Sequence, residues 1–197
     1  MDPKVFITPI PVPCPVPTYP SGGGPVVGGA AAAGTVLTTK ERRKQLKEFA
    51  ESQATNPDRV DAMAKIADKS ADLVKGLPDP ATAMVDDMSA VLVGDGLLIG
   101  RDKGSSYAGD KFPGFAGFDK SFHNPFAPRD NQMHHAMAGI HLGYHYPSPV
   151  ESFVKWYEME PWDKRLYDST FALGNGLNNN NYSTLGDRIK ENLGKTK

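Results

Sequence analysis

Residues 129–146 read RDNQMHHAMAGIHLGYHY and hold four of the chain's five histidines. At helical spacing the large apolar side chains fall on one stripe, which consists of Met133, Met137, Ile140 and Tyr144. Another face carries only small residues, namely Ala136, Gly139 and Gly143. Because small residues let a neighbouring helix approach closely, we expect a central helix that packs on more than one side.

A stripe of histidines runs beside the apolar stripe. His141 and His145 are four residues apart, which places their Cα atoms about 6 Å apart on a helix and lets both imidazoles reach one ion. His134 lies about 10.5 Å from His141 along the helix axis, where it flanks the same cleft. Leu142 stands where the HExxH pattern of zinc proteases has its general-base glutamate.

Three interpretations of these histidines stay open. They are ligands of a divalent transition metal such as zinc, with His141, His145 and His134 as the candidates, or one of them is an acid–base catalyst, or they are structural. A metal site would also need carboxylates from other segments, for which the candidates are Asp119, Asp130, Glu158 and Asp163.

The first turn of the segment has an unusual composition for a helix. Asp130 is the expected N-cap, and Asn131 and Gln132 follow it although amide side chains are not favoured within helices. If this turn faces the preceding loop, Asn131 and Gln132 orient substrate or water while His135 acts as general base or acid. The alternative is that the two amides satisfy backbone groups of a buried loop. The candidate catalytic residues are therefore His135, Asn131, Gln132 and Asp130.

The preceding segment, residues 101–130, is rich in glycine and phenylalanine and reads as a long loop. Long irregular segments inside compact domains are uncommon and are often functional. Its phenylalanines either pin the loop onto the core or form an aromatic wall that leads to the histidines: Phe112, Phe115, Phe118, Phe122 and Phe126.

Helical periodicity recurs along the rest of the chain. Asn56 and Asp79 are each followed by a proline, as expected for an N-cap residue and the first helical position. At residues 94–96, Gly-Asp-Gly either ends a helix or turns a hairpin, and we favour a helix followed by a turn. The sequence predicts a mainly α fold: a bundle of six to seven helices with one long Gly/Phe-rich loop. The predicted helices span residues 38–53, 56–76, 79–93, 130–146, 148–161, 161–174 and 183–193.

Residues 1–37 differ from the rest of the chain. A proline occurs at nearly every second position of ITPIPVPCPVPTYP, and a spacer rich in glycine and alanine follows. Such a segment favours polyproline II, so we expect either a disordered tail or an extended segment that docks a protein partner. The predicted organisation is this Pro/Gly-rich N-terminal tail and a single helical domain over residues 38–197.

The composition excludes several functional classes. With 22 basic and 23 acidic residues, the chain has no electrostatic footprint for nucleic acid or an anionic membrane. Its single cysteine rules out an internal disulfide and a cysteine-rich zinc site. No apolar stretch is long enough to span a bilayer, and the N-terminus lacks the features of a cleaved signal peptide. We expect a soluble protein that is cytoplasmic or is exported without such a signal.

One part of the chain resembles a known kind of domain. The N-Q-x-x-H motif of residues 131–135, the helix over residues 166–174 and the closing segment of residues 185–189 are similar to an uncharacterised helical domain of RHS-type and other polymorphic-toxin or secreted effector proteins. The similarity covers residues 118–193, although Ala136 stands where an aromatic residue is expected. It implies a secreted or delivered effector and brings no established reaction.

The function that we expect is that of a delivered effector, with hydrolysis as the reaction if the chain is an enzyme. Its site would lie between the Phe-rich loop and the start of the histidine segment. The alternative is a non-enzymatic helical adaptor or structural subunit that docks a partner through residues 1–37. In that case the histidines are packing residues or a patch that titrates near its ordinary pKa.

Overall fold

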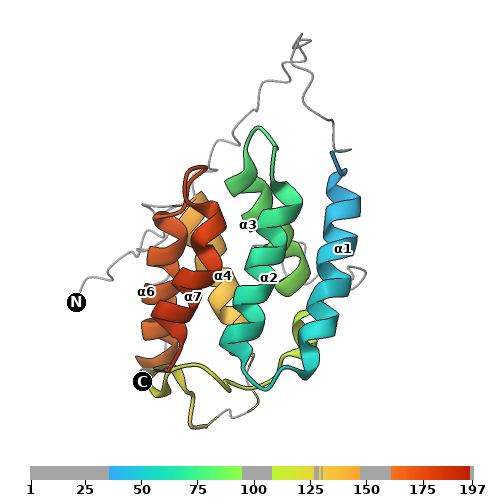
Figure 1. The fold of residues 1–197 in the computed structure, drawn as a ribbon. Helices are drawn as coiled ribbons and strands as arrows, with labels where there is room; N and C mark the ends of the chain where they lie inside the picture. The colour runs from blue at the N-terminus through green and yellow to red at the C-terminus, as the bar shows by residue number, and fades with distance from the viewer. Residues whose placement is uncertain (1–35, 95–107, 127–128, 130, 147–160, 196–197) are drawn as a thin grey trace, which may run out of the picture. The chain divides into compact units, whose positions relative to one another are not determined.

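The computed structural model describes residues 36–94, 108–126, 129, 131–146 and 161–195 (Figure 1). The chain divides into two compact units, Met1–Gly34 and Thr35–Lys197, and all of the described residues belong to the second. The predicted tail up to residue 35 and the predicted helix over residues 148–161 therefore lie outside the described residues.

Six α-helices make up most of the described residues, and no β-strand occurs among them. The prediction of a mainly α fold is confirmed. Within the described part of the chain, no helix has the length and apolar character needed to cross a membrane. The helices are α1 Thr39–Ser52, α2 Arg59–Val74, α3 Pro80–Leu92, α4 Gln132–His145, α6 Pro161–Asn175 and α7 Leu185–Leu193. Short 3-10 helices occur at η1 Gln53–Thr55, η2 Gly109–Lys111, η3 Lys120–Phe122 and η4 Tyr182–Thr184.

Two helices start where the sequence predicts. Thr38 caps α1 through a capping box, in which its hydroxyl accepts from the backbone N–H of Glu41 and the Glu41 carboxylate accepts from the backbone N–H of Thr38. α3 begins at Pro80, and the carboxylate of Asp79 caps it. These two starts are set by local side chains, which is why the sequence alone identifies them.

The start of α2 differs from the prediction. Asp58, rather than Asn56, is the N-cap, and its carboxylate accepts from the backbone N–H of Asp61 at 2.9 Å. Asn56 instead accepts from the backbone N–H of Asp58 at 3.0 Å and donates to the Asp61 carboxylate at 2.9 Å. Because Asn56 makes its own turn with Asp58, the helix starts after this turn and Pro57 stays outside it.

The start of α4 is also later than predicted. Asn131, rather than Asp130, is the N-cap, and its side-chain oxygen accepts from the backbone N–H of His134 at 3.0 Å. The Asn131 amide nitrogen also donates to the carbonyl oxygen of Gly109 at 2.5 Å. A carboxylate could make the first of these bonds but not the second, which explains why the amide takes the cap position.

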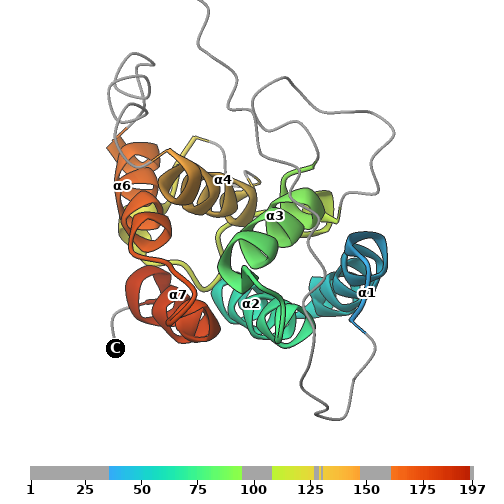
Figure 2. The same ribbon diagram turned by 90° about the horizontal axis from the view of Figure 1, so that it is seen from above.

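α4 packs on more than one side, as its sequence predicts. Seen from above, α4 lies between α3 and α6, while α2 lies between α1 and α7 (Figure 2). Met133, Met137 and Ile140 are at most 1% exposed, and Tyr144 packs against the same core. The apolar stripe of α4 is therefore confirmed.

The small-residue face of α4 packs against α6. A Cβ atom on Gly143 would lie 2.2 Å from the carbonyl oxygen of Phe171. From the opposite side, a Cβ atom on Gly174 would lie 2.0 Å from the carbonyl oxygen of Ile140. Glycines on both helices thus allow the two backbones to come into contact, which holds α4 firmly in place.

The described part of the Phe-rich segment is held against this core. Phe115 is partly buried and stacks on His123 with ring centroids 4.0 Å apart, whereas Phe126 is 85% exposed. The other phenylalanines of the segment are buried in the core: Phe112, Phe118 and Phe122. Most of these rings therefore have the pinning role, which is the first of the two roles expected for them.

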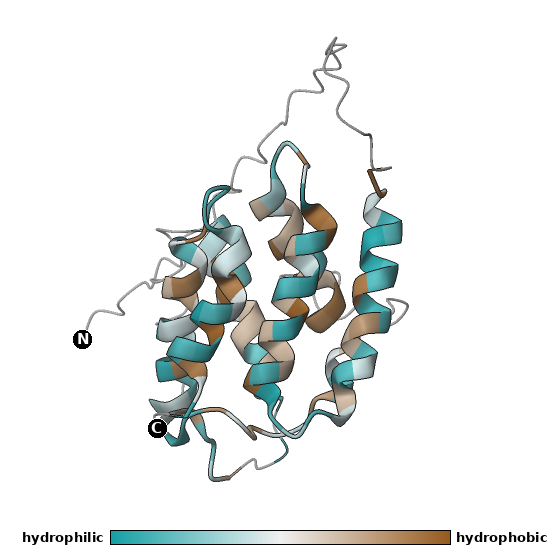
Figure 3. Cartoon of the chain, viewed as in Figure 1, coloured by the Kyte–Doolittle hydropathy of each residue, from teal (hydrophilic) through white to brown (hydrophobic). Residues whose placement is uncertain are grey.

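α3 is the most apolar of the helices that surround α4, whereas α1 is largely hydrophilic (Figure 3). α3 ends at Leu92 and Gly94 adopts a positive φ of 102°, so the helical part of the prediction is confirmed, whereas residues 95–96 of the predicted turn lie outside the described residues. Two consecutive carboxylates, Asp86 and Asp87, interrupt the apolar sequence of α3. Asp86 contacts α4, and Asp87 contacts α1.

Candidate metal centre

Two packed helices bring one carboxylate and two imidazoles together. Asp86 comes from α3, and His141 and His145 come from successive turns of α4. One candidate ligand atom from each side chain lies within 4.8 Å of the other two. All three residues are partly buried, and the side chains of His145 and Asp86 are 25% and 40% exposed, so the group is accessible from solvent.

His145 contacts both of the other members of the group. Its Nε2 atom lies 2.8 Å from Oδ1 of Asp86, and its ring centroid lies 4.5 Å from that of His141. The Asp86 hydrogen bond orients the His145 ring, and the i, i+4 spacing on α4 sets the distance between the two imidazoles.

A second cross-helix pair fixes the register of α3 on α4. The hydroxyl groups of Thr82 and Tyr144 are 2.8 Å apart. Thr82 precedes Asp86 by one helical turn, and Tyr144 precedes His145 by one residue. The two pairs act together, because sliding either helix along its axis would break both.

His141 is held in its neutral form. Burial, together with the charge of His145, lowers the pKa of His141 to about 4, although Asp86 opposes this shift. The Nδ1 atom of His141 is buried and has no hydrogen-bond partner among the described residues. A neutral imidazole with an unused ring nitrogen is the form that ligates metal ions.

Asp86 is held in its ionised form. Burial raises its pKa, but the hydrogen bond from His145 and the positive charges of His145 and Arg43 outweigh burial and lower the pKa below its ordinary value. The group therefore offers one carboxylate and at least one neutral imidazole near neutral pH. These are the protonation states that a metal site requires.

Two histidines and one carboxylate are a common ligand set for divalent transition metals. Ligand atoms around a tetrahedral zinc ion lie about 3.4 Å apart. Here Nε2 of His145 and Oδ1 of Asp86 lie 2.8 Å apart and no pair of candidate ligand atoms exceeds 4.8 Å, so small side-chain rotations would bring the three atoms to these separations. Three protein ligands leave at least one coordination position for water or substrate, which is the arrangement of catalytic rather than structural zinc sites.

The structure brings together two of the three histidines predicted as metal ligands. His141 and His145 join Asp86, whereas His134 lies outside this group. The His134 ring instead lies edge-on to that of His135, with centroids 5.6 Å apart. The separation of seven residues between His134 and His141 on one helix is the physical reason.

Two residues of the predicted first-turn cluster bind the backbone of the preceding segment. Asn131 donates to Gly109, and the fully buried Gln132 donates to the carbonyl oxygen of Phe122 at 2.7 Å. Both amides thus satisfy backbone groups of the preceding segment, which is the second role considered for them. His135 is exposed, and Asp130 lies outside the described residues.

The carboxylate of the group comes from α3, a helix that was predicted from the sequence but not as a source of metal ligands. Of the predicted candidates, Asp119 caps η3 by accepting from the backbone of Ser121, Asp163 lies on α6, and residues 130 and 158 are not described. The sequence feature that could have identified Asp86 is the pair Asp86 and Asp87 in an otherwise apolar helix. Consecutive helical residues point in different directions, so Asp86 and Asp87 need separate partners.

A scan against protein-family models, a search of curated proteins and a search of solved structures each found no match to this chain. The resemblance of residues 118–193 to effector domains therefore stays a prediction.

Proposed function

We propose that this chain binds a divalent transition metal such as zinc through Asp86, His141 and His145, and that this metal centre makes it a hydrolase. The observation that carries the proposal is the convergence of the three side chains from α3 and α4, with candidate ligand atoms within 4.8 Å of one another. A delivered, effector-type context and docking of a partner through residues 1–37 are proposed with it, on the basis of the sequence.

The reaction class follows from the open coordination position. A divalent ion with three protein ligands lowers the pKa of its bound water to about 7 and polarises a substrate carbonyl or phosphoryl group. Leu142 occupies the position at which zinc proteases have their general-base glutamate. The protein would therefore supply metal ligands and charge, but no general base from this position.

The hydrogen bond between Asp86 and His145 predicts how an ion would bind. The proton on Nε2 of His145 lies between two atoms that both become ligands, so an ion has to displace it. Metal binding should therefore release a proton and weaken as the pH falls. Calorimetric titrations in buffers of different ionisation enthalpy measure this release directly.

The test of metal binding is a titration of the metal-stripped chain with Co²⁺ and Zn²⁺. We expect His141→Ala, His145→Ala and Asp86→Asn each to weaken binding by at least about 100-fold, because each removes a direct ligand. His134→Ala and His135→Ala are matched controls, since they remove histidines from the same helix but not from the group. Wild-type affinity in all three ligand variants would contradict the proposal.

Hydrolysis is tested separately with p-nitrophenyl acetate and bis(p-nitrophenyl) phosphate as general ester and phosphodiester probes. Activity that requires added Zn²⁺ and is lost in His141→Ala supports the proposal. If His135→Ala abolishes activity while His141→Ala retains it, the chemistry belongs to the first turn of α4. Stoichiometric metal binding with no turnover of either probe would leave a metal-binding protein and overturn the assignment as a hydrolase.

A further inference from the structure

We infer that Arg42 and Arg43 of α1 are positioning residues for the metal centre, because they hold Asp87 and thereby fix the direction in which the preceding residue, Asp86, presents its carboxylate. The inference rests on the proposed function of Asp86 as a ligand. It assigns a role in that function to two residues that lie outside the group of ligands.

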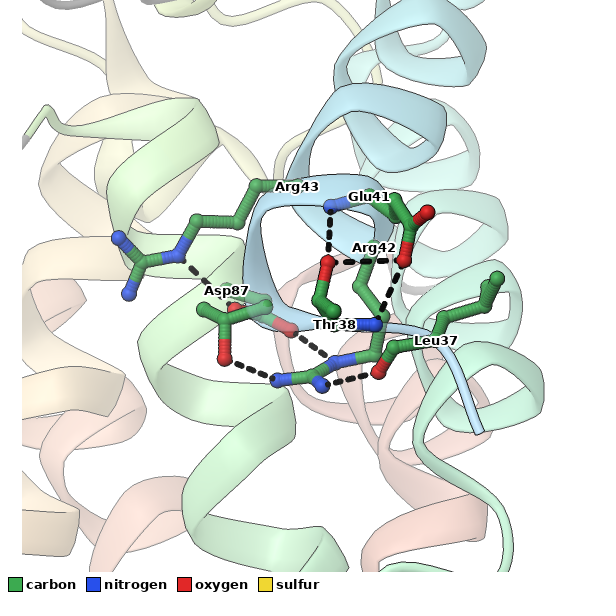
Figure 4. Close-up of polar contacts among 7 residues, drawn as sticks. Leu37, Thr38, Glu41, Arg42, Arg43 and Asp87 are labelled. Atoms are coloured by element: carbon green, nitrogen blue, oxygen red, sulfur yellow. Dashed lines mark hydrogen bonds and ion pairs between the residues drawn. The ribbon is translucent and has the colours of Figure 1, made fainter. Parts of the chain in front are cut away.

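The contacts of Asp87 are shown in Figure 4. Arg42 donates from Nε to Oδ2 of Asp87 at 2.8 Å, and Arg43 donates from Nε to Oδ1 at 2.9 Å. Each carboxylate oxygen therefore has its own guanidinium partner. We call the three residues Arg42, Arg43 and Asp87 the α1–α3 clamp.

The clamp is anchored at the start of α1. The two terminal nitrogens of Arg42 donate to the carbonyl oxygen of Leu37 at 3.1 Å and to the hydroxyl of Thr39 at 3.2 Å. Thr38 closes the capping box of the same turn (Figure 4). Arg42 cannot shift without disturbing the first turn of α1, so it holds Asp87 in a fixed place.

The ion pair of Arg42 and Asp87 in the clamp is buried. The side chains of Arg42 and Asp87 are only 7% and 2% exposed. A buried ion pair is often no more stabilising than well-packed apolar residues, whereas removal of one partner is strongly destabilising. The clamp is therefore better explained by the orientation that it enforces than by a gain in stability.

The metal centre requires that α3 presents Asp86 towards His145 of α4. Successive residues of a helix point about 100° apart, so Asp87 can face α1 while Asp86 faces α4. A rotation of α3 that turned Asp86 away from His145 would pull Asp87 from both guanidinium groups. The clamp and the Asp86–His145 bond thus fix the same rotation of α3 from two sides.

Arg43 provides the sharpest test, because its charge and its contact act in opposite directions on metal binding. As a positive charge close to Asp86, Arg43 repels a cation, so loss of its charge alone should strengthen metal binding. As a positioning residue it holds Asp87, so its loss should weaken metal binding. Weaker binding in a variant that lacks the charge therefore indicates positioning.

The experiment compares Arg43→Gln with Lys44→Gln in the full chain. The Lys44 side chain is 76% exposed on the same turn of α1, so its substitution removes an equal charge without touching the clamp. We expect Arg43→Gln to weaken Co²⁺ binding about 10-fold and to alter the cobalt absorption spectrum, as loss of residues that support a ligand does. Arg43→Lys should retain most of the affinity, since an ammonium group can still donate to Oδ1 of Asp87.

A second measurement does not depend on metal. The ¹⁵N chemical shifts of the His145 ring in the metal-free chain report its hydrogen bond to Asp86, and they should change in Arg43→Gln but not in Lys44→Gln. Failure of the wild-type chain to bind Co²⁺ would overturn the proposed function, and the ring shifts would still decide whether the clamp positions Asp86.

The inference is wrong if Arg43→Gln lowers the thermal midpoint but leaves both the Co²⁺ affinity and the His145 ring shifts as in the wild type. Circular dichroism establishes that each variant is folded. If Arg43→Gln does not fold, Asp87→Asn, which keeps the size of the side chain, must show the same loss of affinity and the same change in shifts.

Discussion

A histidine buried beside a second histidine has little freedom in its protonation state. His141 is in this position, and burial together with the charge of His145 lowers its pKa to about 4. In the unfolded chain its pKa returns to about 6.5. The neutral form of His141 favours metal binding. Because the folded chain disfavours protonation of His141, acid lowers the stability of the folded state.

The metal-free protein should lose stability as the pH falls from about 6.5 to about 4. In this window the unfolded chain binds a proton at His141 that the folded chain does not bind, so the free energy of unfolding decreases with decreasing pH. Because His141 is only partly buried, we expect a loss of about 1–2 kcal/mol rather than the full value of the shift. Urea denaturation at several pH values in the presence of a chelator measures the slope.

His141→Gln should flatten this slope, because it removes the group that titrates. His135→Gln is the matched control, since it removes an exposed histidine from the same helix. An unchanged slope in His141→Gln would show that other groups govern the acid sensitivity.

The contact between α4 and α6 holds the two histidines of the metal centre in place. α4 carries His141 and His145 on one face, and on another face its backbone lies against that of α6. The space between the two helices is too small for a methyl group at Gly143 or Gly174. This contact is thus a second support of the site, opposite to α3.

Gly174→Ala should destabilise the protein by about 3 kcal/mol, because the new methyl group meets the carbonyl oxygen of Ile140 and the helices must move apart. The effect exceeds the gain of helix propensity, which is about 1 kcal/mol for this change. Thermal or urea denaturation measures the difference. Asn175→Ala, at the exposed neighbouring position, is the control and should change stability by less than about 0.5 kcal/mol. Equal stability of Gly174→Ala and the wild type would mean that α6 can shift away without loss.

At the scale of the whole molecule, the helical unit has its own continuous core. Its buried residues extend from α1 to α7 and include the phenylalanines that pin the segment before α4. The contacts of the metal centre and of the α1–α3 clamp come from residue 37 onwards. The described residues of this unit therefore include the proposed metal ligands and the clamp.

Deletion of residues 1–34 should leave the thermal midpoint and the Co²⁺ affinity of the chain unchanged, because the unit Thr35–Lys197 keeps its core and its metal ligands. Docking through residues 1–37 predicts that the deletion abolishes assembly with a partner while the helices persist. The adaptor alternative predicts in addition that the chain does not bind Co²⁺ before or after the deletion. Parallel thermal melts, Co²⁺ titrations and co-purification from cells compare the two. A truncated chain that no longer folds or binds metal would show that the helical unit depends on the segment removed.

The residues of single helices were predictable because their pattern is local. Helical periodicity identified α1, α3 and α4, Pro80 marked the start of α3, and the glycine face of α4 predicted its close helix neighbour. The same reasoning paired His141 with His145, since their distance depends only on the geometry of one helix. The same reasoning chose the wrong N-cap residue at Asn56 and Asp130, because hydrogen bonds to neighbouring residues decide which of several possible residues caps a helix.

The sequence by itself determined a helical protein in which one helix packs on more than one side and carries a pair of histidines on one face. Only the tertiary structure decided that Asp86, 59 residues before His145, completes the group, and that Arg42, 45 residues before Asp87, fixes the helix that carries both carboxylates. Local periodicity specifies which face of a helix is buried, but not which helix covers it. The partner of each buried charge therefore emerges only when the helices pack.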